Sequence, residues 1–307
     1  MAAPWLSVLM PVWNGERYLA EALQSIRAEG TEGYEVIAVD DGSSDSSPDI
    51  LSKWEGLLPL RRIVRKRGGN WVAATNAGLR EARGEYVCFL HQDDLWLPGR
   101  LAAIAREARG SPALILHPAL FVGPDGGRLG PWRCPLPEGE VDPRLFAERL
   151  IVQNFIAIPA PAFRRDLALR LGGMDERLWF AADWDLWLRL GREGAIRHFD
   201  AILAAFRVHP ESQTVVRNDL GERRAQLAAV LERHAGAAPP AARRAARFSA
   251  EMNVALLAAA SRTAVPWRPL LGALLRLGPA SLVRYLRDSR ILERVGARLH
   301  LGRRAAA

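Results

Sequence analysis

The sequence predicts an α/β fold in which a mostly parallel sheet is flanked by helices and followed by a C-terminal helical extension. Short apolar runs alternate with stretches of helical periodicity, the pattern of parallel strands joined by crossover helices. Three of the runs end abruptly in polar side chains. From Asn218 onward the composition shifts to Ala, Leu and Arg, which favours helices.

Four apolar runs have the composition of buried strands: residues 5–12, 34–39, 86–90 and 113–122. Residues 60–65 are predicted to be the third strand in chain order. Helical periodicity follows these runs, at residues 16–26, 46–54, 73–79 and 101–108. Further along, residues 145–150 and 182–190 are predicted to be helical and residues 196–208 to form a strand pair. Residues 154–163 contain two prolines, so an irregular or edge strand is expected there.

Polar side chains follow three of the predicted strands at the point where each strand ends. The first strand leads into Pro11-Val12-Trp13-Asn14, the second into Asp40-Asp41 and the fourth into Gln92-Asp93-Asp94. Because ligands bind at the carboxyl ends of strands in open parallel sheets, these residues are expected to line one site.

The adjacent carboxylates of Asp93 and Asp94 are open to two interpretations. Asp favours helix N-caps, and the sequence LWLP follows the pair. Neighbouring carboxylates at the end of a buried strand also repel each other unless a cation lies beside them, and a divalent metal is the usual partner. The clustering of acids at one edge of the sheet favours the metal site. His91 is expected to stack or hydrogen-bond near this strand end.

Three further residues are candidates for the site. Asp183 and Asp185 fall in the first turn of the helix predicted over 182–190, where the positive end of the helix favours an acid. Dipole complementation is the preferred interpretation of Asp185, whereas Asp183 follows two alanines and is sterically open. His209 is predicted on a loop, where it is either solvated or completes a carboxylate metal site.

Composition limits the classes of protein to which this chain can belong. The 307 residues are 49% hydrophobic, enough for a substantial core, and the two cysteines give neither a disulfide framework nor metal-ligand spacing, which fits a reducing cytoplasm. We find no signal peptide, and no run approaches the roughly 18 apolar residues that span a bilayer. A cytoplasmic protein at the inner face of the cell membrane is therefore expected.

The net charge of +8 is concentrated in the C-terminal part. Residues 218–307 contain 16 Arg, no Lys and 6 acids, a balance of +10, which leaves −2 for residues 1–217. No nucleic-acid partner is expected. Four helices are predicted at 218–235, 240–263, 268–287 and 289–300. Such basic helices are expected to fold back on the domain, to form an oligomer or to rest on an anionic membrane. Folding back is favoured for the first two helices. Peripheral membrane contact through 268–300 is favoured for the other two.

Five motifs occur in order along the first two thirds of the chain. They are SVLMPVWNG (7–15), EVIAVDDGSSD (35–45), NAGL with ARGEY (76–79 and 82–86), QDDLWLP (92–98), and DWDLWLRL with RVHPES (183–190 and 207–212). In order, spacing and flanking chemistry the chain resembles the family 2 glycosyltransferases of GT-A fold. The resemblance divides the chain into a GT-A domain over 1–215 and a basic amphipathic helical extension over 216–307. The GT-A domain is expected to have a nucleotide-binding half (1–110) and an acceptor and catalytic half (111–215).

The resemblance implies inverting transfer of a sugar from a nucleotide-diphosphate sugar, expected to be a UDP-sugar, to a glycan or lipid-linked acceptor in cell-surface polysaccharide synthesis. It implies a Mn²⁺ or Mg²⁺ cofactor held at Asp94 and His209, and Asp183 as the general base. The nucleotide-binding positions implied are Pro11, Val12, Asn14, Asp41 and Asp93. A carboxylate opposite the leaving group deprotonates an acceptor hydroxyl and contributes about 10²- to 10⁴-fold to the rate.

Two positions depart from the pattern of the resembled family. Ala182 stands where an acid often precedes the base, and Thr75 stands where Arg is common, so Lys66, Arg67 or Arg207 are expected to contact the diphosphate. A catalytically silent domain that binds a sugar nucleotide or a partner is therefore an alternative. A nucleotidyltransferase is a weaker one, because WNGER after the first strand is not a Gly-rich, basic phosphate loop.

Overall fold

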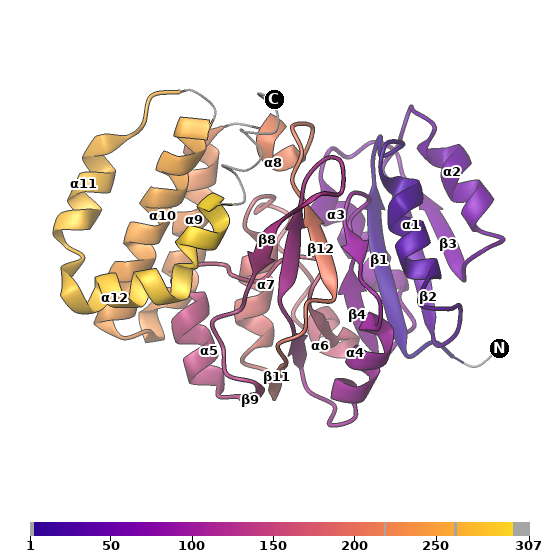
Figure 1. Cartoon of the computed structure of the whole chain (residues 1–307), viewed down its shortest axis with the longest axis horizontal. Coiled ribbons are helices and arrows are strands. Elements are labelled where there is room, and N and C mark those ends of the chain that lie inside the picture. Colours follow the sequence, from indigo (N-terminus) through magenta and orange to yellow (C-terminus); the bar gives the residue numbers. More distant parts are fainter. Residues whose placement is uncertain (1–2, 218, 261–262, 297–307) are drawn as a thin grey trace.

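The computed structural model describes residues 3–217, 219–260 and 263–296. Within these ranges, helices flank a central sheet of strand order β3-β2-β1-β4-β10-β6-β11-β9, and the C-terminal helices lie at one end of it (Figure 1). The predicted class, an α/β fold with a mostly parallel sheet and a helical extension, is confirmed.

The first half of the sheet is parallel and contains β1 (Leu6–Val12), β2 (Tyr34–Asp40), β3 (Leu60–Val64) and β4 (Tyr86–Phe89). Helix α1 (Leu19–Arg27) covers one face, beside α2 (Ser47–Trp54), and α3 (Trp71–Glu81) covers the other. Val8 and Met10 belong to the core cluster on the α1 side, whereas Leu9 belongs to the cluster on the α3 side. Because both faces are covered, β1, β2 and β4 are buried along their whole length.

The second half of the sheet is mixed. β10 (Ala162–Arg164) runs antiparallel between β4 and β6 (Leu114–Leu116), and β6 pairs in parallel with β11 (Ile196–His198), which borders β9 (Gly139–Val141). Of the two alternatives for residues 154–163, the irregular one is confirmed over 154–161, and the edge strand is wrong because β10 is interior. Pro159 and Pro161 precede its paired residues and therefore remove no hydrogen bond from the sheet.

A second sheet contains β5 (Leu95–Trp96), β12 (Ala204–Arg207), β7 (Ala119–Val122) and β8 (Arg128–Trp132). The single strand predicted over 113–122 is wrong, since β6 and β7 lie in different sheets and Pro118 separates them. The neighbouring His117 is a satisfied core residue: its Nε2 lies 2.6 Å from Nη1 of Arg100 and its Nδ1 lies 2.8 Å from its neighbour's carbonyl oxygen. The strand pair predicted over 196–208 exists as β11 and β12, one in each sheet.

The remaining helices of this part are α4 (Arg100–Ala108), α5 (Pro143–Leu150), α6 (Arg165–Arg170), α7 (Ala182–Leu190) and α8 (Gln213–Val216). α5 and α7 belong to the same core cluster as α3, whereas α4 contributes Ile104 to the cluster around α1. α7 begins at the predicted residue, which fixes where its two acids lie.

The extension consists of α9 (Leu220–His234), α10 (Pro240–Ala260), α11 (Trp267–Leu275) and α12 (Gly278–Ser289), with a short 3₁₀ turn, η1 (Ala235–Ala237), between the first two. α9 and α10 fold back on the sheet domain as expected. The single helix predicted over 268–287 is wrong: the chain turns at Gly278, whose φ of +69° suits glycine. Residues 291–296 are helical, but Ser289 ends α12 and Arg290 is left-handed, so the helix predicted over 289–300 begins later than expected. Residues 297–300 of that prediction lie outside the described residues.

One hydrophobic core cluster joins the extension to the sheet domain. It contains Phe146 of α5 and Trp184 of α7 together with Val230 of α9, Phe248 of α10 and Tyr285 of α12. The extension therefore completes the core of the sheet domain. None of the helices in the described ranges is both long and apolar enough to cross a bilayer.

Candidate active site

The three polar strand ends meet at one edge of the sheet, as predicted. The backbone N–H of Asp41 donates to the carbonyl of Val12 at 2.9 Å. The side chain of Gln92 accepts from the N–H of Trp13 at 2.8 Å and donates to its carbonyl at 3.1 Å. A Cβ on Gly15 would lie 2.5 Å from this amide, so glycine leaves the room that Gln92 needs. Gln92 therefore joins the end of β1 to the turn after β4.

Asn14 connects the first strand end to the second. Its backbone has a φ of +47°, its N–H donates to Oγ of Ser43 at 3.0 Å, and its Oδ1 accepts from the N–H of Ser44 at 2.9 Å. Asn is among the residues that adopt this left-handed conformation most readily. Asn14 is exposed, whereas Pro11 and Val12 are buried within β1.

The carboxylate of Asp41 lies at this edge but is covered by the loop after β3. Its two oxygens accept from the N–H groups of Gly68 and Gly69 at 2.9 to 3.1 Å, and Nη1 of Arg67 is 3.6 Å away. The guanidinium of Arg67 stacks 3.4 Å from the ring centroid of Trp13. Only 5% of the Asp41 side chain is exposed. A nucleobase therefore reaches this carboxylate only if the loop moves aside.

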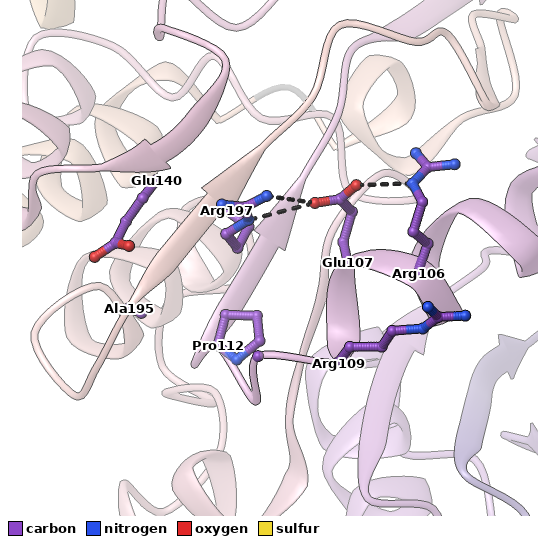
Figure 2. Close-up of a pocket in the computed structure, with 8 residues that line it drawn as sticks. Arg106, Glu107, Arg109, Pro112, Glu140, Ala195 and Arg197 are labelled. Atoms are coloured by element: carbon purple, nitrogen blue, oxygen red, sulfur yellow. Dashed lines mark hydrogen bonds and ion pairs between the residues drawn. The ribbon is translucent and has the colours of Figure 1, made fainter.

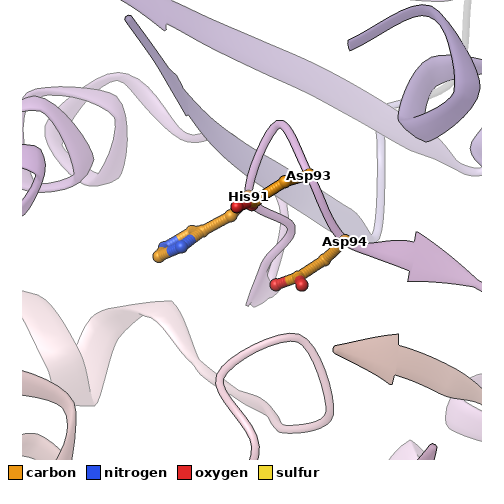
Figure 3. A group of neighbouring side chains, drawn as sticks. All are labelled: His91, Asp93 and Asp94. Atoms are coloured by element: carbon orange, nitrogen blue, oxygen red, sulfur yellow. The ribbon is translucent and has the colours of Figure 1, made fainter. Parts of the chain in front are cut away.

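His91, Asp93 and Asp94 leave a single turn between β4 and β5 (Figure 3). One ligating atom from each lies within 4.8 Å of those of the other two. Oδ2 of Asp94 and Nε2 of His91 are buried and have no hydrogen-bond partner in the part of the chain that is described. Buried polar atoms without partners are costly, and a divalent cation bound to these atoms would satisfy them. The donor set therefore fits a metal ion.

The two acids of this turn have opposite electrostatic properties. Burial and the charge of Asp93 raise the pKa of Asp94 well above its usual value. Burial by itself also raises the pKa of Asp93, but the hydrogen bond with His209 and the nearby His91 lower it overall. Two histidines thus partner Asp93, while the charge of Asp94 remains poorly compensated.

Arg207 at the end of β12 holds this turn in place. Its backbone N–H donates to Oδ1 of Asp94 at 2.9 Å, and its Nε donates to the carbonyl of Asp93 at 2.8 Å. Its Nη1 and Nη2 donate to carbonyls of the loop before β8 and to Glu21, the latter at 2.7 Å. The expectation that Arg207 contacts a diphosphate is wrong, because its guanidinium is buried and every nitrogen is already bonded. The only sequence signal for this role is a cation at the end of an apolar strand.

His209 lies at the same turn. Its Nε2 is 2.9 Å from Oδ2 of Asp93, its ring packs against Tyr18, and its buried Nδ1 has no partner among the described residues. The structure thus brings His209 to Asp93, not to Asp94 with which the sequence grouped it. His91, which the sequence predicts to stack or hydrogen-bond near the strand end, lies within reach of Asp94. Its ring packs edge-on against Trp71, with centroids 4.9 Å apart.

Asp183 occupies the first turn of α7. Its Oδ2 accepts from Nδ2 of Asn154 and its Oδ1 from the N–H of Trp184, both at 2.8 Å. Burial raises the pKa of Asp183 to about 6, in spite of these two hydrogen bonds. Trp71 packs on His91 and donates to the carbonyl of Trp179 at 2.8 Å, so the segment leading into α7 lies beside the strand ends.

Asp185 lies in the first turn of α7, as the sequence predicts, and has further partners there. Its fully buried carboxylate accepts from Arg189 at 2.7 Å and from Arg233 of α9 at 2.6 Å, and it lies 2.9 Å from Nε2 of His234. Burial alone raises its pKa, but the hydrogen bonds from His234 and the arginines lower it to about 2. Asp185 therefore fixes α7 to α9 in addition to lying at the positive end of α7.

A cavity of about 320 Å³ lies at the opposite end of the sheet, before the starts of β6 and β11. Figure 2 shows that Glu107 in this cavity is paired with Arg197 and Arg106. The charge of Glu107 is therefore compensated by these two arginines.

The comparisons with known proteins agree with this geometry. The family model for "Glycosyl transferase family 2" matches residues 7–165. The chain is 26% identical over 227 residues to an uncharacterized glycosyltransferase of Rickettsia typhi, covering 69% of this chain and 66% of that protein. It is 31% identical over 116 residues to the putative glycosyltransferase EpsH of Bacillus subtilis, covering 38% of this chain and 34% of that protein. The chain thus spans between about a third and two thirds of the length of these relatives.

Two solved structures share the fold. S. aureus TarS 1–349 in complex with UDP-GlcNAc superimposes with a TM-score of 0.63 at 19% identity, over 95% of this chain and 88% of that one. The mannosyltransferase PcManGT from Pyrobaculum calidifontis, in complex with GDP-Man and Mn²⁺, gives a TM-score of 0.56 at 21% identity, over 98% and 88%. With a family match over more than half of its length and this GT-A architecture, the chain belongs to glycosyl transferase family 2.

Proposed function

We propose that this protein is a metal-dependent, inverting glycosyltransferase. It transfers a sugar from a nucleotide-diphosphate sugar, a UDP-sugar by expectation, to a hydroxyl of a glycan or lipid-linked acceptor in cell-surface polysaccharide synthesis. The observation that carries the proposal is the carboxylate of Asp183. It lies in the first turn of α7, is partly exposed and has a pKa raised to about 6, and the segment leading into this helix is bonded to Trp71, which packs on His91 at the strand ends.

In this proposal the donor lies across the ends of β1, β2 and β4. Pro11, Val12 and Asn14 contact the nucleotide from the first strand end, Asp41 contacts the base, and Asp93 contacts the ribose or the sugar. The fold shared with structures that contain UDP-GlcNAc or GDP-Man supports this placement. Because the loop amides now cover Asp41, donor binding is accompanied by displacement of residues 66–70.

Asp94 is the proposed principal metal ligand, with His91 and Asp93 on the same turn. The Mn²⁺ in the PcManGT structure supports Mn²⁺ or Mg²⁺ as the cation. When bound, such an ion offsets the negative charge that develops on the departing diphosphate. His209 supports the site through Asp93, and its Nδ1 remains a candidate for direct ligation.

Asp183 is the proposed general base. Its carboxylate accepts the proton of the acceptor hydroxyl while the hydroxyl oxygen attacks the anomeric carbon. The bond between that carbon and the diphosphate oxygen breaks on the opposite face, and its electron pair leaves with the diphosphate. Attack from the face opposite the leaving group inverts the anomeric centre. Asn154 keeps the carboxylate in place for this step through its 2.8 Å hydrogen bond.

The proposal is tested by initial rates of sugar transfer and donor hydrolysis over a panel of sugar nucleotides with Mn²⁺ or Mg²⁺. Asp183→Asn lowers kcat by about 10²- to 10⁴-fold, because the base is lost while the shape of the site is kept. Asp94→Ala, or chelation of the metal, abolishes transfer. Asp49→Asn, at an exposed position on α2, is the matched control and retains wild-type rates. Full activity of either site variant would refute its assigned role.

A catalytically silent sugar-nucleotide-binding protein is the second candidate. Ala182 in place of an acid favours it, as does Thr75, which is buried and bonded to the carbonyl of Trp71. Calorimetry separates the two functions. Binding of a nucleotide diphosphate with metal, but without turnover over any acceptor, would favour the silent protein.

A further inference from the structure

The outermost helices of the extension carry an unusual concentration of exposed apolar side chains. Of the twelve large apolar side chains that are exposed within the described ranges, eight lie between residues 267 and 292. We call these eight the docking face: Trp267, Leu271, Leu274, Leu275, Leu282, Val283, Leu286 and Leu292. The exposed fraction reaches 78% for Leu275 and 84% for Leu292. Monomeric soluble proteins rarely expose so many neighbouring apolar residues without a binding role.

The docking face lies on both of the outer helices. α10 packs against α11 and against α12, and Figure 1 shows these helices at the end of the molecule opposite α2 and β3, with α11 outermost. On α12 the buried side chains include Ser281, Tyr285 and Asp288, which recur at the spacing of one helical face. Leu282, Val283 and Leu286 fall on the other side. The helix is thus amphipathic, and its apolar residues are the exposed ones.

Basic side chains flank the docking face. Arg268 and Arg276 on α11 are exposed and have no acidic partner among the described residues. Arg243, Arg244 and Arg247, together with Pro240, line a cavity of about 300 Å³ at the start of α10. Nε of Arg244 donates to Oγ of Ser281 at 3.2 Å, so this cavity adjoins α12 next to Leu282. We call this cavity, with its three arginines, the arginine cavity.

We propose that the docking face and the arginine cavity together bind the surface of an anionic lipid bilayer, with α11 and α12 lying in the interface. The apolar side chains enter the boundary between headgroups and acyl chains, and the arginines pair with headgroup phosphates. Charge complementarity selects this partner over a second copy of the chain. Two copies meeting through this surface would bring their unpaired arginines together, whereas an anionic bilayer neutralises them.

The structure changes the sequence expectation of a membrane-binding segment at 268–300. It adds Trp267 and the three arginines of α10 to the surface. It removes Leu270, which is buried, and Arg284, which pairs with Glu148 of α5 at 2.9 Å. Residues 297–300 lie outside the described residues.

This inference does not rest on the proposed function, because vesicle binding is measured without turnover. The experiment is co-sedimentation of the full chain with vesicles of phosphatidylcholine, with and without phosphatidylglycerol, at low and high salt. We expect binding to the anionic vesicles at low salt and a loss of binding as salt screens the arginines. Binding that is absent at low salt, or equal on neutral vesicles and insensitive to salt, would overturn the proposal.

Two variants test the two halves of the surface. Leu271→Glu/Leu275→Glu/Val283→Glu and Arg243→Gln/Arg244→Gln/Arg247→Gln are each expected to weaken binding by about tenfold or more, since each basic residue contributes about fivefold near an anionic surface. The matched controls are Leu57→Glu/Val64→Glu and Arg27→Gln/Arg80→Gln/Arg128→Gln, at exposed positions elsewhere. Equal losses in variants and controls would overturn the proposal.

Folding and self-association are checked in the same preparations. All of the replaced side chains are exposed, so the thermal midpoint of each variant is expected to match that of the wild type. Light scattering without vesicles is expected to give a particle of the same mass for wild type and variants. A dimer that the glutamate substitutions dissociate would show that a second copy covers the docking face, and would overturn the bilayer proposal.

Discussion

Asp183 combines two properties that a general base requires. Its carboxylate is held by Asn154 and by the N–H of Trp184, and burial raises its pKa to about 6. A base with a pKa near the working pH is ionised often enough to act and basic enough to accept a proton. The hydrogen bonds fix the position of the carboxylate, and burial raises its pKa. Asp183 therefore has both the position and the basicity that a general base requires.

This property predicts the pH dependence of catalysis. Because Asp183 must be ionised to accept a proton, kcat/KM is expected to fall as the pH drops below about 6. Asn154→Ala removes a hydrogen bond that lowers this pKa, so the acid limb of the profile shifts to higher pH. The measurement is kcat/KM from pH 5 to 8, a range set by roughly one unit or more on either side of that pKa.

Asp49→Asn serves as the control for this profile and leaves the limb in place. A wild-type limb near the ordinary pKa of an aspartate would contradict the assignment of the limb to Asp183. An unchanged limb in Asn154→Ala would do the same.

At the scale of single residues, the sequence predicts some residues of the candidate site and does not predict others. Asp93 and Asp94 stand out because two acids follow a buried strand. Gln92, Arg67 and Arg207 act through contacts with segments distant in sequence, such as Gln92 with Trp13 and Arg207 with Glu21. Nothing in their local sequence records those partners.

At the scale of elements, the junction between α7 and α9 connects the candidate base to the extension. Asp185 lies two residues after Asp183 on the same helix, and its partners Arg233 and His234 come from the end of α9. Arg233 also pairs with Asp175 at 3.0 Å, on the segment that leads into α7. The extension therefore holds α7, the helix of the candidate base, from one side.

We expect Asp185→Asn to destabilise the protein by about 2 kcal/mol at neutral pH, the free energy that corresponds to lowering a carboxyl pKa from 3.8 to about 2. Because the folded-state pKa is depressed, this contribution is present above about pH 4. It is lost as the pH falls towards 2. Chemical denaturation of wild type and variant across this range measures the difference.

The kinetic effect of Asp185→Asn distinguishes a displaced Asp183 from a loss of stability alone. Asp185→Asn is expected to lower kcat while leaving the KM for the donor unchanged, since the donor lies on the strand ends and only the base moves. The control is Asp166→Asn, which weakens the partly exposed pairs of Asp166 with Arg164 and Arg170 and is expected to cost less than about 1 kcal/mol. A variant with wild-type kcat would show that the junction does not position Asp183.

The elements themselves were predicted well where both faces of a strand are covered. β1, β2 and β4 read as continuous apolar runs for that reason. Pairing was harder to predict, because residues 113–122 form one apolar run but divide at Pro118 between two sheets. Whether a short strand such as β10 is interior or at an edge depends on β4 and β6 coming to its two sides.

At the scale of the whole molecule, the sheet domain and the extension share one core. Leu227 and Val230 of α9 belong to the same cluster as Trp184 of α7. Ser249 and Asn253 of α10 both donate to Oε1 of Gln153, at 2.8 and 2.7 Å, directly before Asn154. We therefore propose that the division at residues 215 and 216 separates two roles within one cooperative unit.

This proposal predicts the outcome of truncation. A chain ending at residue 217 would leave the core of α5 and α7 exposed and Asp185 without Arg233 and His234. It is expected to be insoluble or to lack a cooperative thermal transition, as measured by circular dichroism. A truncated chain that keeps the wild-type midpoint and activity would instead make the extension an independent unit.

By itself the sequence determined the α/β class, the family resemblance, the polar ends of three strands and the basic character of the extension. The fold class and the charge of the extension follow from composition and periodicity, whereas the resemblance follows from five short motifs in order along the chain. Only the tertiary structure decided that His91 joins Asp93 and Asp94, that Arg207 is a buried clamp, that Asp185 binds α9, and that a loop covers Asp41. The last three depend on contacts between residues far apart in sequence, and the grouping of His91 with the neighbouring acids depends on the conformation of the turn that carries them. Burial and hydrogen-bond partners exist only once the chain has folded.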